Sequence, residues 1–369
     1  MGSLIINIIE RTLRAYRRYK CYKFYAMQFK KYMASMGFEN RKAVGENEYI
    51  AKWKILSTRV EPYSYRFYCH YVGFTPNIVP EDIGRSYIEP VLNPPIYRGV
   101  YADKNMFPEI IGKQYVPRTI LCRINGSNLL DGNFQKADKE FSCYFDGVSD
   151  VILKPSVESS SGVGIIKFVK SGGTYISVDG EHELTRKFLM TYNLNFCLQE
   201  VVRQHDFMNH LCRTCVNTVR LCLYKSVRDE TPKVTASIIR IGKDGSFVDN
   251  AHAGGMFIGV DLKTGMLANY VIDHRGYKSN EWNGIDFSSS NFVVPNWNDI
   301  VSFAEFVGTR IHHHRLIALD IALERSGKPI LIEYNIRSFS YWFYLLTGQN
   351  VFGDYTDEVI DYCRKNARN

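Results

Sequence analysis

The chain has 369 residues, 45% hydrophobic and 23% charged, which is enough apolar material for two or three packed lobes. Its net charge of +8 is concentrated in the first 34 residues, which carry +7, and this distribution argues against a nucleic-acid-binding face. No apolar run is long enough to span a bilayer, we expect no signal peptide, and nine unpatterned cysteines indicate reduced thiols in the cytoplasm.

Residues 1–36 are predicted to form a basic amphipathic helical segment. Apolar residues recur at three- and four-residue steps from Ile5 through Leu13 to Tyr19, and basic residues fill many of the other positions. One interpretation is peripheral contact of residues 1–35 with an anionic membrane, at its inner face. The other is a helix packed on the protein body with its basic face in water. The sequence leaves both open.

The remaining chain predicts an α+β fold built mainly from antiparallel hairpins. Residues 37–102 are expected to form an N-terminal α/β subdomain, and the proline-rich stretch 90–95 marks a joint. Further helices are expected near 103–112, 183–191, 297–313 and 355–366. Strands are expected at 118–124, 141–145, 150–154, 163–169, 174–178, 195–202, 216–224, 233–241, 256–260, 316–323 and 329–334. No regular βαβ repeat is present, which disfavours a doubly wound sheet.

Three oxygen-bearing side chains lie on the last two predicted strands. Asp320 is the single acid in an apolar strand, and Glu333 and Asn335 end the next strand on one shared face. A turn at 325–328 would bring the two strands together. Carboxylate and amide oxygens beside phosphate groups suit Mg²⁺, so we predict a magnesium site here.

A lysine followed by a serine- and glycine-rich loop indicates a phosphate site. Lys154 ends an apolar strand, and the loop continues to Gly164. Backbone N–H groups of such a loop can cover phosphate oxygens while the lysine supplies charge. The loop lacks the GK[ST] of a P-loop.

The strand ending near Val202 turns polar, as expected of a hinge that presents its backbone to an adenine ring. Asp206 follows and can accept hydrogen bonds from ribose hydroxyls. Arg220, in the next strand, either faces a phosphoryl group or pairs with Glu200 or Asp206.

Taken in order, these pieces resemble the ATP-grasp fold from about Asp103 to Asn335. The resemblance implies two α+β lobes that grip ATP between antiparallel sheets, here with an N-terminal helical extension. It assigns Lys104 and Lys154 to the phosphates, and 103–198 and 199–369 to the small and large lobes. The remaining ATP contacts that it implies are Ser160, Ser161, Gly162, Gly164, Gln199, Glu200, Val202 and Asp206, and the magnesium ligands are Asp320, Glu333 and Asn335.

More narrowly, the chain resembles the sugar-transfer-associated ATP-grasp family. The features are the Lys-Pro-x-x-x-x-Ser-Ser-Gly-x-Gly run from Lys154, the segment 217–220, and Asp249-Asn250 before Gly254-Gly255. That family is associated with surface and capsular polysaccharide synthesis. One departure concerns the arginine that many such ligases carry two residues before the first magnesium ligand, where this chain has Ala318. The candidates for that cation are Arg220 and Arg240, and Arg337 is a candidate contact for a substrate carboxylate.

The resemblance implies an ATP- and Mg²⁺-dependent carboxylate–amine ligase that acts through an acyl phosphate. The expected partners are small carboxylate and amine substrates, such as a carboxylated sugar or an amino acid, and not nucleic acid. His252 is a candidate to orient the amine, although a structural histidine is commoner in such loops. Two alternatives stay open: a kinase of the same fold, and a membrane-associated polysaccharide-assembly binding protein with a vestigial ATP site.

Overall fold

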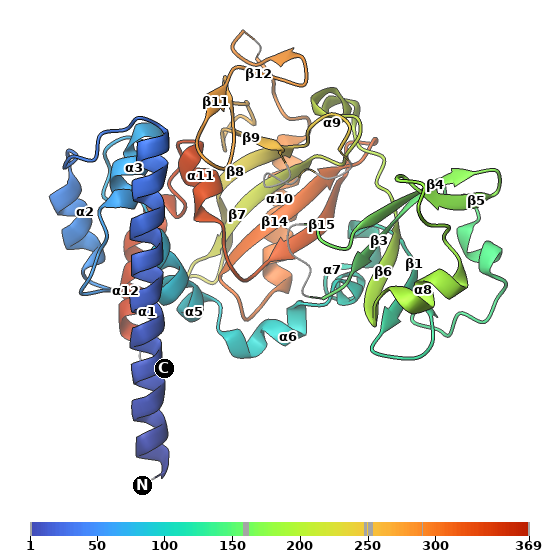
Figure 1. Ribbon diagram of the computed structural model, residues 1–369, viewed down its shortest axis with the longest axis horizontal. Coiled ribbons are helices and arrows are strands. Elements are labelled where there is room, and N and C mark those ends of the chain that lie inside the picture. The colour runs from blue at the N-terminus through green and yellow to red at the C-terminus, as the bar shows by residue number, and fades with distance from the viewer. Residues whose placement is uncertain (1, 158–161, 247–248, 250–253, 290, 368–369) are drawn as a thin grey trace.

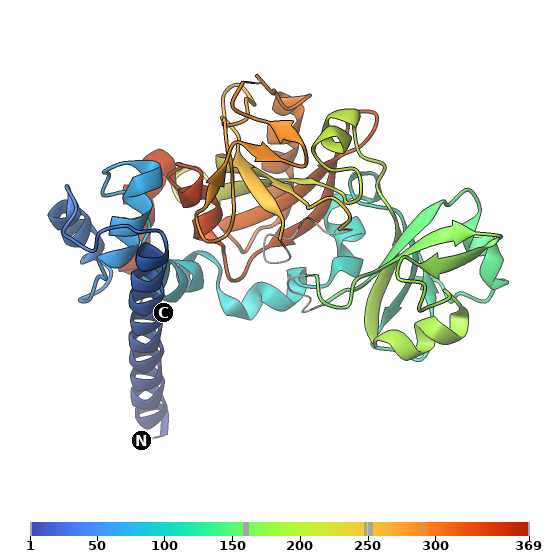
Figure 2. The same ribbon diagram turned by 45° about the horizontal axis from the view of Figure 1, so that its top comes forward.

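The computed structural model describes residues 2–157, 162–246, 249, 254–289 and 291–367. Figure 1 shows a helical region at one end, a large sheet in the middle and a smaller sheet at the other end. The same three parts stay separate in the turned view of Figure 2.

The N-terminal region is helical. Its elements are α1 (Gly2–Ser35), α2 (Glu46–Trp53), α3 (Tyr63–Val72), α4 (Glu81–Ile83), the π-helical turn η1 (Gly84–Ile88), α5 (Glu89–Leu92), η2 (Pro95–Tyr97) and α6 (Arg98–Tyr101). The expected α/β character of 37–102 is therefore wrong, since this fully described range contains helices only. Its aromatic residues favour strands by propensity, but in α3 the buried Tyr65 and Tyr68 share one helical face.

The smaller sheet has the strand order β2-β1-β6-β3-β4-β5, and the pairs within it are antiparallel. Its strands are β1 (Thr119–Ile124), β2 (Leu130–Asp131), β3 (Asp150–Pro155), β4 (Ile166–Ser171), β5 (Thr174–Ser177) and β6 (Asn195–Glu200). The helices η3 (Lys104–Met106), α7 (Phe107–Ile111) and η4 (Lys113–Tyr115) precede this sheet in the chain, and Phe107 and Ile111 of α7 pack in the core of the larger sheet. The helices η5 (Phe141–Phe145) and α8 (Arg186–Tyr192) lie between its strands in sequence. The strand predicted at 141–145 is wrong: it is the 3₁₀ helix η5, in which the rings of Phe141 and Phe145 contact each other.

The larger sheet has the order β11-β10-β9-β8-β7-β14-β15. Its strands are β7 (Thr218–Lys225), β8 (Pro232–Ile241), β9 (Met256–Gly259), β10 (Val271–Ile272), β11 (Lys278–Ser279), β14 (Leu316–Leu323) and β15 (Pro329–Asn335). Around it lie α9 (Asp206–Leu211), the hairpin β12 (Glu281–Trp282) and β13 (Ile285–Asp286), α10 (Trp297–Arg310), α11 (Tyr341–Leu346), η7 (Gly353–Tyr355) and α12 (Thr356–Asn366). Because α10 ends at Arg310, His312–His314 lie in a loop and not in the predicted helix.

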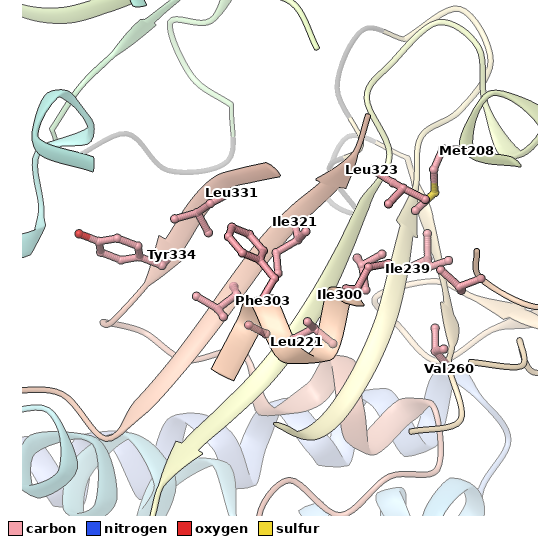
Figure 3. Close-up of a cluster of buried hydrophobic side chains, with 14 of the residues drawn as sticks. Met208, Leu221, Ile239, Val260, Ile300, Phe303, Ile321, Leu323, Leu331 and Tyr334 are labelled. Carbon is pink, nitrogen blue, oxygen red and sulfur yellow. The ribbon is translucent and has the colours of Figure 1, made fainter. Parts of the chain in front are cut away.

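Both faces of the large sheet are covered, which explains why β14 is buried along its whole length. Ile317, Leu319 and Ile321 point into the cluster that includes α10 side chains, part of which Figure 3 shows. Leu316 and Ala318 point the opposite way, into a second cluster formed with the N-terminal helices, α11 and α12. Asp320 has the same strand parity as Leu316 and Ala318, so it lies on that second face, farther along the strand.

The helix α1 is half packed and half projecting. Phe29 and Met33 are buried against the body, and the Nε of Arg18 donates to the carbonyl of Ser86 at 3.4 Å. Toward the N-terminus, Ile9 and Leu13 are exposed, and Figures 1 and 2 show this half extending beyond the other elements. None of the helices in the described ranges is both long and apolar enough to cross a membrane.

Candidate active site

Asp320, Glu333 and Asn335 are brought together by the hairpin of β14 and β15. Asp320 and Glu333 are directly opposed, and the register shifts just after Asp320. The Nδ2 of Asn335 donates to Asp320 Oδ2 at 3.3 Å, which orients the amide toward the carboxylate. Asp320 is 2% exposed, whereas the side chain of Glu333 is 31% exposed. The three predicted magnesium ligands are therefore neighbours on one face.

Two arginines from adjacent strands neutralise Asp320. Arg220 of β7 is its cross-strand partner, and Arg220 Nη1 lies 2.9 Å from both Asp320 oxygens. Arg240 of β8 places Nη1 3.3 Å from Asp320 Oδ2 and Nη2 2.8 Å from Asp249 Oδ1. The Oγ1 of Thr218 donates to Asp249 Oδ2 at 2.5 Å. These residues form one buried network of alternating charge.

The acidic residues of the network favour the charged form of Arg240. Burial lowers the pKa of Arg240, but Asp249 and Asp320 more than offset this effect, so its pKa is raised overall. Burial raises the pKa of Asp249, against the opposing effect of Arg240. The Nε atoms of Arg220 and Arg240 are buried without a hydrogen-bond partner among the described residues, so both guanidinium groups retain donors for another acceptor.

Two lysines approach this network from the small lobe. Lys104 begins η3, its backbone N–H donates to the carbonyl of Ser156 at 2.9 Å, and its Nζ lies 3.1 Å from Glu333 Oε1. Lys154 is the last residue but one of β3 and is 8% exposed. Burial lowers the pKa of Lys154, and the neighbouring Lys104 lowers it further. Lys154 forms no ion pair within the described ranges, and the Cys197 thiol and the Glu333 carboxylate oppose the lowering of its pKa.

The predicted adenine hinge lies at the end of β6. Gln199 pairs with Ile152 of β3, and its Nε2 lies 3.3 Å from Thr119 Oγ1, while its Oε1 is buried without a partner in the described part of the chain. Glu200 ends the strand, its N–H is bonded to the carbonyl of Arg118, and Val202 follows in irregular chain. Asp206 is the exposed first residue of α9.

The predicted phosphate loop is only partly described. Ser160 and Ser161 lie outside the described residues, as does His252. Gly162 and Gly164 have φ angles of 76° and 77°, and a Cβ on Gly164 would stand 3.2 Å from Pro155 Cγ. Glycine is therefore favoured at 164 by both backbone conformation and space.

The predicted cations separate into two groups. Arg220 and Arg240 join the metal-ligand candidates, whereas Arg337 is exposed beyond the end of β15. The alternative that Arg220 pairs with Glu200 or Asp206 is wrong, since its partner is Asp320. Asp249 and Thr218 belong to the charge network but were not among the predicted site residues. A polar residue beginning an apolar strand was the only local signal for Thr218, and Asp249 carried no signal of its own for an arginine partner.

The oxygen set fits Mg²⁺ in its chemistry. Glu333 and Asn335 are partly exposed, so a cation can approach their oxygens from solvent. Asp320 already accepts four hydrogen bonds, two from Arg220 and one each from Arg240 and Asn335. A metal at Asp320 would therefore replace at least one of these donors.

Cys212 and Cys215 lie in the segment between α9 and β7. Both thiols are buried 3.6 Å apart, and the Gln204 side chain donates to both backbone carbonyls. Among the described residues no group of three or more His, Cys, Asp or Glu side chains is arranged to hold a metal. The candidate magnesium site is of a different kind, because it has two carboxylates plus an amide.

Comparison with solved structures returns several ligases and synthetases at low sequence identity and low structural scores. A D-alanine–D-alanine ligase from Coxiella burnetii is 10% identical with a TM-score of 0.40, covering 72% of this chain and 59% of that one. An L-amino acid ligase from Bacillus licheniformis is 10% identical with a TM-score of 0.34, covering 65% and 41%. An N5-carboxyaminoimidazole ribonucleotide synthetase from Thermotoga maritima is 8% identical with a TM-score of 0.36, covering 70% and 52%.

The chain spans less than two thirds of the length of each of these three proteins. A search of curated proteins found no match. The model of one family, described as sugar-transfer associated ATP-grasp, matches residues 84–358, well over half of the chain. The predicted fold class, mixed helices and antiparallel sheets in an ATP-grasp arrangement with an N-terminal helix, is confirmed. The chain belongs to the sugar-transfer associated ATP-grasp family.

Proposed function

We propose that the chain is an ATP-dependent carboxylate–amine ligase that activates a carboxylate as an acyl phosphate. The main observation for this proposal is that two lysines of the protein lie close to a carboxylate that can bind a metal ion. Lys154 is a buried cation without an anionic partner among the described residues, Lys104 lies beside it, and the oxygens of Glu333 face them. A polyphosphate with its magnesium would satisfy the lysines and the carboxylate at once.

The small lobe would hold the nucleotide. Lys104 and Lys154 would bind the phosphates, and the loop containing Ser160, Ser161, Gly162 and Gly164 would cover them and exclude water. Gln199, Glu200 and Val202 would line the adenine position, where the buried Gln199 Oε1 offers an acceptor. Asp206 would bind the ribose hydroxyls.

The large lobe would hold the metal ion and stabilise the negative charge that develops during the reaction. Asp320, Glu333 and Asn335 would hold Mg²⁺, which would reduce the repulsion between an attacking carboxylate and the phosphates. Arg220 and Arg240 would stabilise the charge that develops as the amine attacks, because each keeps a buried Nε donor available. Arg337 would contact a substrate carboxylate.

We further propose a carboxylated sugar or an amino acid as the carboxylate substrate, with a role in surface or capsular polysaccharide synthesis. The family to which the chain belongs supports this choice, because it is associated with sugar transfer. We also propose that the domains span 1–36, 37–102, 103–198 and 199–369. The second of these is helical.

The test begins with calorimetric titration of ATP and Mg²⁺ into the full chain and into Lys154→Ala. We expect magnesium-dependent binding that the substitution weakens roughly ten- to a hundredfold, the value of one or two charge-assisted hydrogen bonds. Lys170→Ala is the matched control, because Lys170 is an exposed lysine on β4 of the same sheet. Absence of binding to the wild type would contradict the proposal and favour a vestigial site.

Product analysis separates the ligase from a kinase of the same fold. With carboxylate and amine pairs present, the ligase should release ADP and free phosphate in equal amounts with an amide product. Retention of the phosphoryl group on the product would identify a kinase instead.

Peripheral membrane contact through residues 1–35 is a second proposal, which would place the chain in the cytoplasm at the inner face of a membrane. Its support is the projecting half of α1, where Ile9, Leu13 and Tyr16 are 52%, 47% and 53% exposed in a segment of net positive charge. An apolar stripe among basic residues suits an anionic bilayer surface.

Co-sedimentation with anionic vesicles tests this contact. Leu13→Asp should reduce binding, and salt should reduce it as well, since the attraction is partly electrostatic. Val44→Asp is the control, because Val44 is 70% exposed on a different segment. Equal binding of the two variants, or binding indifferent to salt, would count against a membrane role for α1.

A further inference from the structure

The two carboxylate oxygens of Asp320 are held unequally. Among the described residues, Oδ1 accepts one hydrogen bond, from Arg220 at 2.9 Å. Oδ2 accepts three, from Arg220 at 2.9 Å and from Arg240 and Asn335 at 3.3 Å each. The two 3.3 Å contacts are longer than the usual N–H···O distance of about 2.9–3.0 Å, so they are the weaker ones. Oδ2 is therefore the oxygen that can most easily exchange a donor for a metal ion.

Arg220 cannot easily leave Asp320. It occupies the cross-strand position opposite Asp320, and its side chain is 8% exposed. Within the described ranges its ion pair is with Asp320 alone, and the ring centroid of Phe343 lies 5.1 Å from its Cζ. A buried cation that loses its counter-charge strongly destabilises the folded state. Arg220 should therefore stay paired with Asp320 whether or not a metal is bound.

Arg240, in contrast, has a second carboxylate to hold it. Its Nη2 lies 2.8 Å from Asp249 Oδ1, whereas Nη1 is the nitrogen that contacts Asp320. Asp249 is held in turn by Thr218, whose Oγ1 donates to Asp249 Oδ2 at 2.5 Å. Thr218 is the cross-strand partner of Arg240 on β7 and β8, which lie side by side in Figure 1. Arg240 can thus give up Asp320 and keep an anionic partner.

Asn335, the other weak donor, can become a metal ligand itself. Rotation of its amide puts the oxygen where Nδ2 now lies. The oxygens proposed for Mg²⁺ would then be Asp320 Oδ2, the Glu333 carboxylate and the Asn335 amide oxygen. With Oδ2 occupied in this way, Nη1 of Arg240 becomes an available donor, while Asp249 keeps the guanidinium group at the site.

We propose that Asp249 is a positioning residue, which retains Arg240 at the site when a divalent cation replaces Arg240 on Asp320. The proposal rests on the proposed magnesium site and gives the two arginines different tasks. Arg220 remains the counter-charge of Asp320. Arg240 offers Nη1 to the reacting groups only after the metal has bound, so the donor that stabilises developing negative charge is withheld from the metal-free protein.

The experiment measures Mn²⁺ binding to the full chain by electron paramagnetic resonance of the free ion, with and without an equimolar non-hydrolysable ATP analogue. Mn²⁺ is the probe because it accepts the same oxygen ligands as Mg²⁺. Asp249→Asn should weaken Mn²⁺ binding roughly tenfold or more, because Arg240 then has Asp320 as its one charged partner and competes with the metal. Asp244→Asn, at an exposed acid in the segment after β8, is the matched control and should leave the affinity unchanged.

A double-mutant cycle separates positioning from simple attraction between Asp249 and the metal. Arg240→Gln removes the competing guanidinium, so Asp249→Asn added to it should change Mn²⁺ affinity less than about twofold. Simple attraction would make Asp249→Asn equally costly with and without Arg240, and that result would overturn the proposal.

Thr218 gives a second test, which holds even if a member of the cycle fails to fold. Thr218→Val removes the hydroxyl that donates to Asp249 and should weaken Mn²⁺ binding, whereas Thr218→Ser keeps the hydroxyl and should bind like the wild type. Equal affinities of these two variants would overturn the role of Asp249 and leave the magnesium site standing. Failure of the wild type to bind Mn²⁺ in either condition would refute the magnesium site, and the role of Asp249 with it.

Discussion

Arg220 and Asp320 face each other across β7 and β14, with one guanidinium nitrogen 2.9 Å from both carboxylate oxygens. Arg240 adds a second cation to the same carboxylate. A residue predicted from the sequence as a metal ligand is therefore also the anion that holds two buried arginines. Because of this double role, substitution of Asp320 should change the stability of the protein as well as its activity.

Asp320→Asn should lower both the free energy of unfolding and the ATP turnover. The neutral amide would leave Arg220 and Arg240 without a shared counter-charge, and breaking a buried pair typically costs about 3–5 kcal/mol. Urea unfolding measures the loss, and ATP turnover should fall below detection in the same variant.

Glu333→Gln is the matched comparison. Its side chain is 31% exposed and that of its partner Lys104 is 8% exposed, whereas Asp320 holds two buried arginines, so Glu333→Gln should destabilise the protein less than Asp320→Asn does. Turnover should still be lost. Equal destabilisation by the two substitutions would contradict the central position of Asp320 in the arginine network.

Lys154→Met should raise the stability of the nucleotide-free protein while it weakens nucleotide binding. Burial lowers the pKa of Lys154, which means that the folded state disfavours the charged ammonium at neutral pH. Removing that charge should stabilise the free protein by on the order of 1 kcal/mol. Thermal unfolding with and without MgATP measures both effects, and Lys170→Met should change neither. Loss of stability in the free protein would show that Lys154 has a structural partner.

Glu61→Gln should flatten the pH dependence of stability. Glu61 is fully buried, and burial together with Asp82 raises its pKa from the ordinary value of 4.5 to about 8. Above the ordinary value the unfolded chain loses a proton that the folded chain still holds, so stability falls as pH rises toward the folded pKa. The variant should remove up to about 1.4 kcal/mol per pH unit of that slope.

The substituted amide can keep the backbone contacts of this position. Its oxygen could still accept from the N–H groups of Tyr63 and Ser64, which Glu61 caps at 2.7 and 3.0 Å. Denaturant unfolding from pH 5 to 8 gives the slope. Glu39→Gln, at an exposed side chain, should leave the slope unchanged. An unchanged slope in Glu61→Gln would mean that Glu61 titrates alike in both states.

Asn93→Ala should destabilise the protein by roughly 2–4 kcal/mol, the cost of leaving several buried backbone groups without partners. The side chain donates to two carbonyls and accepts from the N–H groups of Arg315 and Leu316, all at a fully buried position. Asn298→Ala, at an exposed position on α10, is the control for urea unfolding, and equal stability of the two variants would contradict this account.

The strands of the candidate site could be predicted because their apolar runs are long and bounded by turn residues. The predicted range 316–323 matches β14 at both ends, and 329–334 differs from β15 by one residue. The opposition of Asp320 and Glu333 follows from the short turn between those strands. The family resemblance, rather than periodicity, supplied Lys104.

Contacts between distant segments could not be predicted. The side chain of Asn93 donates to the carbonyl of Leu316, more than 200 residues farther along the chain, and no local pattern relates the two. The α/β expectation for 37–102 fails for a different reason. Tyrosine and phenylalanine favour strands, but burial against α1 determines the helix at 63–72. Strand propensity does not decide the structure where one face of a helix can pack against a large apolar surface.

The unbroken course of α1 has a mechanical consequence. Its packed half and its projecting half form one helix from Gly2 to Ser35, with no turn or proline between them. The projecting half therefore has no joint of its own, and a torque applied at the tip would be transmitted to α3 and α4. Any surface that captured the tip would fix the angle at which the whole molecule stands and the side from which a large molecule could approach it.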